Sequence, residues 1–516
     1  MSPPREPRNE VYFISDNYSL SNYNDRQVGK GRRTRVRKAT MDPSSCSFRF
    51  IVLFFNCILT FGPYFCYDMP TVLQNELQGI PNKTCESHEI VPTPGECCED
   101  CTGLSPAQYN LLFAVFSWVN AVTVLFTGFL TDKLGNRAAV LLYSSVTLFG
   151  TSLFAVTTIN SLRSTSAMFP LMLIGRMMLG SGNGGMRIVQ DRVTAFWFKD
   201  KELAMAFGIM LSFSRLGSVL NFFVTTYLYD RFGMAWTFGA GAGLCGFGFL
   251  SAIILSALDR HGIRQLGQEE QIALQSKEVR VAHIRDFPGL FWLLVATITL
   301  FYSAVMPFVA DSSKFLQDEY GLSKPVSAYT AGVVYDVALI LSPVFGLTLD
   351  KYGRRGIVAV CCTGVLVPIY LTFLFTKLYP VILTVTLGLS YTLAAISMWP
   401  SVTKVVGAAY LGTAMGLTTC ILDVGRGISN LIVGKLLGDV ESLTEAVKHE
   451  RWSHVLIFLS CNSGAAFFSS VILSICDRCK YDKLLDKPKP RDPDKYLPES
   501  WKEADPLLGE SNPAIN

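Results

Sequence analysis

Gly128-Phe-Leu-Thr-Asp132-Lys-Leu-Gly135-Asn-Arg137 and Gly346-Leu-Thr-Leu-Asp350-Lys-Tyr-Gly353-Arg-Arg355 are two copies of one pattern, and they decide the fold. In each copy an aspartate follows the first glycine by four positions, and a second glycine and an arginine come after it. Each copy lies between two long apolar runs, so it marks a short turn between membrane helices. Glycine lets two such helices approach closely, and the charged residues can pair with neighbouring helix ends. The sequence therefore predicts two related halves that move against each other.

The composition is that of a membrane protein. Half of the 516 residues are hydrophobic and 17% are charged, so the apolar runs cannot all lie in solvent-facing helices. A helix needs about 20 apolar residues to cross the bilayer core. Runs of that length fall near residues 48–69, 106–131, 138–157, 166–190, 203–227, 234–258, 287–311, 326–349, 356–376, 378–402, 409–436 and 453–476. We therefore predict an all-α membrane protein with twelve transmembrane helices, arranged as two six-helix bundles in the lipid bilayer.

The basic residues predict the orientation, because Lys and Arg beside a span are retained on the cytoplasmic face. Eight of them occur from Arg26 to Arg49, whereas the 70–105 loop has one base, Lys83, and six acids. Both termini are therefore expected in the cytosol, and the basic N-terminal cluster is not expected to bind nucleic acid. The predicted organisation is a disordered cytosolic tail (1–47), an N-terminal bundle (48–258) with a lumenal loop (70–105), a cytosolic linker (259–286), a C-terminal bundle (287–477) and a second disordered cytosolic tail (478–516).

The 70–105 loop has the features of a lumenal segment. It contains Cys85, Cys97, Cys98 and Cys101 and the glycosylation sequon that starts at Asn82. In an oxidising compartment these cysteines form one or two disulfides, although their pairing cannot be deduced from the sequence. A metal site is the alternative, but adjacent cysteines have poor chelating geometry. We predict glycosylation at Asn82 and no metal or cofactor.

Charged residues inside the predicted spans are candidate functional residues, because ionisable groups at bilayer depth are costly and usually face a cavity or a partner. Arg187 and Asp191 are four residues apart, and Asp423 and Arg426 are three apart. Each pair therefore lies on one helical face and is either self-neutralising or part of a polar site.

Other charges have no obvious partner within their own helix. Arg215 and Asp336 either pair with another helix or contact a substrate. Arg176 is either structural or part of a gating network. Lys404 is expected to extend to the cytosolic interface, and Asp68 to lie at the lumenal interface. Neither paired carboxylates nor a nucleophile arrangement is evident, so we predict no enzyme activity.

The glycine-rich run from Gly180 to Gly185 lies within an apolar span. No strand precedes it, so we predict close helix packing there and not a phosphate-binding loop.

The repeated pattern resembles the signature loop of the major facilitator superfamily, which lies between helices 2 and 3 and again between helices 8 and 9. The resemblance implies the major facilitator fold, with a substrate site near the bilayer midplane between two bundles that rock about it. The residues expected to act in gating are Gly128, Asp132, Arg137, Gly346, Asp350, Arg355 and Arg176.

Further stretches between residues 50 and 470 resemble one family within this superfamily, the lysosomal dipeptide transporters called major facilitator superfamily domain-containing protein 1. Among them are Tyr64-Phe-Cys-Tyr-Asp68, Ser117-Trp118-Val-Asn120, Leu211-Ser-Phe-Ser-Arg215-Leu-Gly-Ser218 and Trp399-Pro400. The resemblance implies facilitated diffusion of dipeptides out of lysosomes, without ion coupling and alongside an accessory lysosomal glycoprotein. It also implies that Arg215 contacts the substrate carboxylate. The predicted substrate-binding residues are Arg215, Asp336, Arg187, Tyr64, Trp118, Asn120 and Trp399.

This sequence departs from that family in its charges. The family has a glutamate in the glycine-rich part of helix 4, where this chain has Gly184 or Gly185. Asp336 is therefore our candidate for binding the ammonium group of a dipeptide. The additional arginines suit a more acidic solute equally well, with proton coupling as a further alternative. The missing glutamate also leaves open a non-transporting membrane receptor or scaffold.

The C-terminal tail contains a candidate sorting signal. In Glu503-Ala-Asp-Pro-Leu507-Leu508 an acid precedes a pair of leucines by four positions. This spacing is typical of acidic dileucine signals, which clathrin adaptors bind. We therefore predict a multi-pass protein of the lysosomal membrane, with endosome and plasma membrane as alternatives.

Overall fold

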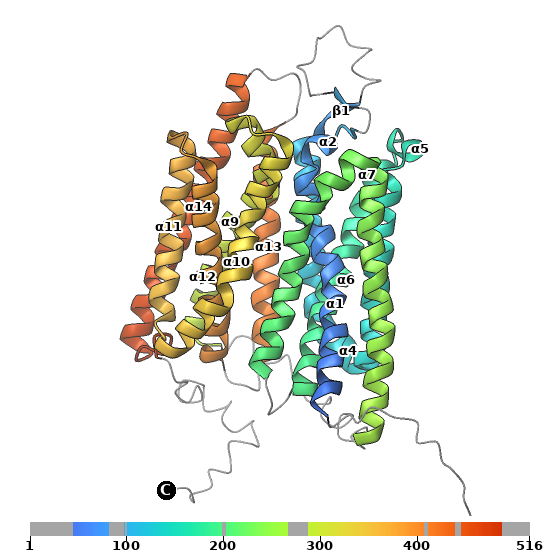
Figure 1. Ribbon diagram of the computed structural model, residues 1–516. Coiled ribbons are helices and arrows are strands. Elements are labelled where there is room, and N and C mark those ends of the chain that lie inside the picture. Colours follow the sequence, from blue (N-terminus) through green and yellow to red (C-terminus); the bar gives the residue numbers. More distant parts are fainter. Residues whose placement is uncertain are drawn as a thin grey trace, which may run out of the picture. The chain divides into compact units, whose positions relative to one another are not determined.

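The computed structural model describes residues 45–81, 97–98, 101–198, 203–266, 287–406, 411–438 and 445–487. The helices of the first half are α1 (Cys46–Val72), α2 (Gln74–Gln78), α4 (Pro106–Thr157), α5 (Asn160–Arg163), α6 (Met168–Phe198) and α7 (Leu203–Leu266). Those of the second half are α9 (Gly289–Tyr320), α10 (Lys324–Tyr352), α11 (Arg355–Phe375), α12 (Pro380–Val405), α13 (Leu411–Leu437) and α14 (Glu445–Lys480). Two short strands, β1 (Ile80–Pro81) and β2 (Cys97–Cys98), pair in parallel. Figure 1 shows α9 to α14, in yellow to red, beside the blue and green helices of the first half.

Two of the long helices are bent back at a glycine. A straight helix with the 52 residues of α4 would be about 78 Å long, far more than a bilayer needs. Gly135 interrupts α4 with a φ of 80°, and Gly233 interrupts α7 with a φ of 76°. Figure 1 shows α7 as two neighbouring arms. Gly353, which has a φ of 70°, ends α10 just before α11 begins. The turns predicted at Gly135 and Gly353 are therefore confirmed, and both use a conformation that favours glycine.

The helices have the length and composition of membrane spans. Within the described residues, nine helices are long and apolar enough to cross a membrane. Helix α4 supplies two of these nine, Pro106–Thr127 and Leu134–Thr157, whereas the bent α7 counts once, and α6 and α13 do not meet the criterion. Both contain charged residues and glycines within their length. The all-α membrane class is confirmed, and the number twelve stays a prediction.

Each half has its own buried core. One cluster of buried side chains belongs almost entirely to the second half, and two others belong mainly to the first. The halves meet mainly where α4 packs on α13 and α7 packs on α10. The candidate functional site lies between the halves, near these two helix contacts.

The predicted linker and C-terminal tail begin later than expected. Helix α7 continues to Leu266, and α14 is followed by ordered turns that end at Lys487. Asp486 fixes these turns at the start of α11, because its carboxylate accepts a hydrogen bond from the backbone N–H of Gly356 (3.0 Å). This contact satisfies a donor that a helix N-terminus otherwise leaves unpaired. The ammonium of Lys404 is buried and donates to the carbonyl of Lys487 (2.5 Å).

The glycine-rich run of α6 packs against α4, as predicted. A Cβ atom at Gly180 would lie 2.5 Å from the carbonyl oxygen of Phe116, and one at Gly182 would lie 2.8 Å from that of Tyr143. Only glycine fits such a close backbone approach.

Replacing Gly180 with valine should therefore destabilise the protein by about 1–3 kcal/mol, the usual cost of overpacking a core. Thermal unfolding in detergent would measure this as a lower melting temperature. Gly243→Val is the matched control, since a Cβ atom there meets nothing within 4 Å. Equal melting temperatures for the two variants would contradict the packing argument.

Candidate functional site

A polar cluster joins α4 to α13 across the two halves. The side-chain amide of Asn120 donates to Oδ2 of Asp423. The other oxygen of Asp423 pairs with Nη2 of Arg426 (2.8 Å), whose Nε donates to the hydroxyl of Ser117 (3.0 Å). Asp423 is 2% exposed. Asp423 and Arg426 therefore form the ion pair that was one of the two alternatives, and each of them also contacts the opposite half. We call these residues the α4–α13 cluster.

Trp118 packs at the same interface. Its indole N–H donates to the carbonyl of Val424 (3.4 Å). A Cβ atom at Gly427 would lie 2.2 Å from that nitrogen, so the indole fills the space that this glycine leaves open. Trp118 and Asn120 thus hold two helices together, and binding of a substrate by either residue stays a prediction.

Arg215 joins the halves on the other side, between α7 and α10. Its Nη1 donates to the hydroxyl of Ser342 and to the carbonyl of Ala338 (3.2 Å). Among the described residues it forms no ion pair, and Asp336 is not one of its partners. The guanidinium is half-buried, so its other N–H groups remain available.

Asp336 lies on α10, one residue after Tyr335, and is half-buried. Within the described part of the chain it makes no hydrogen bond or ion pair. It therefore forms no ion pair with Arg187 or Arg215.

Arg187 and Asp191 lie one turn apart on α6 and are half-buried. Their side chains form no ion pair with each other or with other described residues. The guanidinium of Arg187 lies over the ring of Trp399 on α12, 5.9 Å from its centroid. Arg187 also interacts electrostatically with Tyr64 and Asp191. Arg187, Tyr64 and Trp399, all predicted as site residues, therefore lie close together between the halves.

Aromatic residues of the second half line this region. The indole N–H of Trp399 donates to the hydroxyl of Tyr302 (3.1 Å), and the rings of Tyr302 and Tyr391 are 5.8 Å apart. Both tyrosines interact electrostatically with Arg187 and with Arg215. The two arginines therefore converge on one place. We call it the central site, and its members are Arg187, Asp191, Arg215, Tyr302, Tyr391 and Trp399.

Asp68 is buried between the two halves of the protein. It is 2% exposed, and its Oδ1 accepts a hydrogen bond from Tyr335 across the halves (3.4 Å). Arg176 and Arg426 both interact electrostatically with it. Asp68 is thus buried between the halves, and its place at the lumenal interface of the membrane stays a prediction. The family-like stretch Tyr64-Phe-Cys-Tyr-Asp68 contained the signal for this position.

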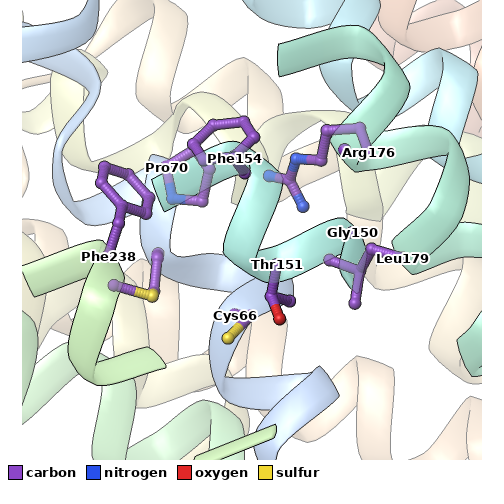
Figure 2. A pocket seen from close by; sticks show the side chains of 10 residues that line it. Cys66, Pro70, Gly150, Thr151, Phe154, Arg176, Leu179 and Phe238 are labelled. Carbon is purple, nitrogen blue, oxygen red and sulfur yellow. The ribbon is translucent and has the colours of Figure 1, made fainter. Parts of the chain in front are cut away.

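Arg176 is buried inside the first half. Its guanidinium donates to the carbonyl of Tyr67 (3.1 Å) and lies 5.0 Å from the centroid of the Phe113 ring. Figure 2 shows it at a small cavity that is also lined by Phe154 and Thr151. With about 20 Å³, the cavity has room for about one water molecule. These contacts lie within one half and favour a structural role.

Hydrogen bonds also join the halves at the end of the molecule that contains α2. The amide of Gln74 donates to Asp311 (2.5 Å), and that of Asn75 donates to Gln317 (2.6 Å). The hydroxyl of Tyr109 donates to a backbone carbonyl of α9 (2.8 Å). The sequence did not predict these α2-end contacts, because Gln74 and Asn75 fall in the predicted 70–105 loop and Gln317 lies after the end of a predicted span.

At the opposite end, Arg137 of the first signature copy forms an ion pair with Asp259 on α7 (3.0 Å). Asp259 also accepts a hydrogen bond from the indole of Trp197 (3.1 Å). Asp259 was missed, although the sequence contains a signal for it. Ser256 to Arg260 and Ser474 to Arg478 share the pattern Ser-x-x-Asp-Arg, with the same separation as the two signature copies.

For several residues predicted to act in gating, sorting or glycosylation, the structure shows little or nothing of the side chain's surroundings. Arg355 is buried, and Gly346 lies in α10 with open space where its Cβ would be. Cys101 is disulfide-bonded, which confirms that this cysteine is oxidised. Its partner is not among the described side chains. Also outside the described residues or side chains are Gly128, Asp132, Asp350, Asn82, Glu503, Leu507 and Leu508.

The chain matches the family model described as Major Facilitator Superfamily over residues 50–430. The chain belongs to the Major Facilitator Superfamily. The repeated turns at Gly135 and Gly353 are thus the signature loops of a major facilitator, and the central site lies between its two halves. Membership in this family of membrane transporters makes the chain a transporter.

Known transporters are similar to this chain in sequence and in fold. The chain is 30% identical over 410 residues to a Homo sapiens protein named lysosomal dipeptide transporter MFSD1, which covers 77% of this chain and 82% of that protein. Its fold is similar to a crystal structure of the peptide transporter POT in complex with sulfate, with a TM-score of 0.60, 13% identity, and coverage of 84% of this chain and 96% of that chain. It is also similar to a bacterial homolog of the human lysosomal transporter Spinster, in an inward-facing and occupied conformation, with a TM-score of 0.57, 14% identity, and coverage of 86% and 100%. At these identities the two structures show the fold alone.

Proposed function

We propose that this major facilitator moves dipeptides across the lysosomal membrane as a uniporter. The observation that carries the proposal is the central site, where Arg187 and Arg215 converge on a wall of aromatic residues between the halves. A guanidinium offers a planar fork that matches a carboxylate, and aromatic rings accommodate varied side chains. The similarity to MFSD1 supports the same substrate class.

A dipeptide also has an ammonium group, which needs an acid. Asp191 and Asp336 are both half-buried and form no ion pair within the described residues. Asp191 has the better position, because it lies one turn from Arg187 and interacts with it electrostatically. Asp336, the candidate from the sequence, lies on α10 in the other half.

Transport proceeds by alternating access, in which the halves rock about the site. The α2-end contacts close one side of the pathway in this conformation. They open when the site faces that side. At the end of the molecule opposite to α2, the signature loops and the ion pair between Arg137 and Asp259 hold neighbouring helix ends together during this movement.

The proposed setting is the lysosome, with both termini in the cytosol. The 70–105 loop then faces the lumen, where Asn82 carries a glycan and an accessory glycoprotein binds. Adaptors bind the dileucine signal at Leu507 and Leu508. A tagged chain that reaches lysosomes equally well without these leucines would contradict this part of the proposal.

Uptake of labelled dipeptides into proteoliposomes containing the purified protein tests the function. We expect uptake that saturates and needs no imposed proton gradient. Accumulation of dipeptides in lysosomes from cells that lack the protein provides an independent test. If no dipeptide moves in either experiment, the proposed function is wrong.

Replacing Arg215 with alanine should reduce dipeptide uptake by about 10-fold to 100-fold, because a charge-assisted hydrogen bond is worth about 1.5–3 kcal/mol. Uptake by purified, equally abundant protein is the measurement. Ser342→Ala is the matched control, since it removes a partner of Arg215 but keeps the guanidinium. An equal loss in both variants would assign Arg215 a structural role only.

A further inference from the structure

The central site holds two arginines that are available to a ligand. Within the described chain, Arg187 makes no hydrogen bond or ion pair, and its guanidinium lies over the ring of Trp399 (5.9 Å). A ring below the guanidinium plane leaves the N–H groups at its edge free to donate. Arg215 uses Nη1 for two neutral oxygens and forms no ion pair with a described residue. Neither arginine therefore has its charge neutralised by a direct partner.

Two other arginines, Arg426 and Arg176, are engaged elsewhere. Arg426 pairs with Asp423 at 2.8 Å. Arg176 forms no ion pair among the described residues, but it lies inside the first half and donates to the carbonyl of Tyr67 (3.1 Å). The charge balance of the central site therefore depends on the charged residues of that site itself.

The charge balance of the central site is positive. Within the central site two arginines accompany one acid, Asp191. Asp423 also interacts electrostatically with Arg187, but its carboxylate already pairs with Arg426. Asp336 is not a member of the central site, and among the described residues it forms no ion pair with either arginine. A neutral dipeptide supplies one carboxylate and one ammonium, and therefore leaves one arginine without a counter-charge. An uncompensated charge at this depth is costly.

We infer that the central site prefers dipeptides with an acidic side chain, and that Arg187 binds the second carboxylate. This inference rests on the proposed function. Such a substrate has two carboxylates and one ammonium, which match Arg187, Arg215 and Asp191.

The inference can be tested by competition in proteoliposomes. Unlabelled Ala-Glu, Glu-Ala and Ala-Ala would compete with one labelled dipeptide. We expect the acidic dipeptides to compete better. In Arg187→Gln the ratio of Ala-Glu to Ala-Ala affinity should fall by about 10-fold to 100-fold, the range for losing one charge-assisted hydrogen bond. Arg187→Lys, which keeps the charge, should retain part of the preference.

Controls separate the possible outcomes. Arg231→Gln removes an exposed arginine of α7 and should leave the ratio as it is. Equal competition by Ala-Ala in the wild type, or an unchanged ratio in Arg187→Gln, would overturn the inference while the proposed function stands. Free glutamate carries the same three charges on a shorter frame. Transport of glutamate but of no dipeptide would overturn the proposed function itself.

Discussion

Cross-linking position 75 to position 317 is expected to reduce transport to the level of empty liposomes. The amide of Asn75 donates to Gln317 at 2.6 Å, so these residues join the two halves at the α2 end. Alternating access requires this end to open once in each cycle. The experiment replaces both residues with cysteine and joins them with a short, reducible, bifunctional thiol reagent. Uptake is then measured before the reagent, after it, and after reduction, which should restore transport.

The control pair lies at the same end but within one half. Lys377 donates to Glu319 at 2.8 Å, and both residues belong to the second half. Cysteines at these two positions, linked by the same reagent, should leave transport intact because the halves still move. Variants with only one of the two new cysteines are treated in the same way. Any loss of uptake in them measures the effect of the reagent on native cysteines. Normal uptake by the fully cross-linked 75–317 variant would show that the α2 end need not open.

The fold follows from local patterns in the sequence. Gly135 and Gly353 were recognisable because each follows an aspartate by three positions between apolar runs. In the structure both adopt a positive φ, which explains why glycine occurs at both turns. The pair Asp423–Arg426 was also foreseeable, since residues three apart share a helical face. Periodicity and composition therefore predict what happens within one helix or one turn.

Contacts between the halves could not be predicted in the same way. Nothing in the spacing of Ser117 and Asn120 indicates that they contact Arg426 and Asp423, about three hundred residues later. Which residues meet depends on how two helices are rotated and shifted against each other, and this is set by packing. The same reason explains why Asp311 was missed, and why Arg215 proved to contact Ser342 and not Asp336.

Replacing Asp423 with leucine is expected to have the largest effect on stability. The carboxylate is 2% exposed and pairs with Arg426, whose side chain is 15% exposed. Removing one member of a buried ion pair leaves the other charge without compensation, which costs about 3–5 kcal/mol. Asn120 loses its acceptor as well. We expect a strongly lowered melting temperature in detergent and a reduced abundance in cells.

The double variant Asp423→Leu with Arg426→Leu shows whether charge or shape is responsible. With both charges removed no buried ion remains unpaired, and an apolar pair of similar size often replaces a buried ion pair at little cost. Most of the lost stability should therefore return. Ser117→Ala serves as the control, because it removes only the neutral partner of Arg426 and should cost about 1 kcal/mol. If the double variant were as unstable as Asp423→Leu, the α4–α13 cluster would depend on its polar contacts between the halves and not on its charge balance.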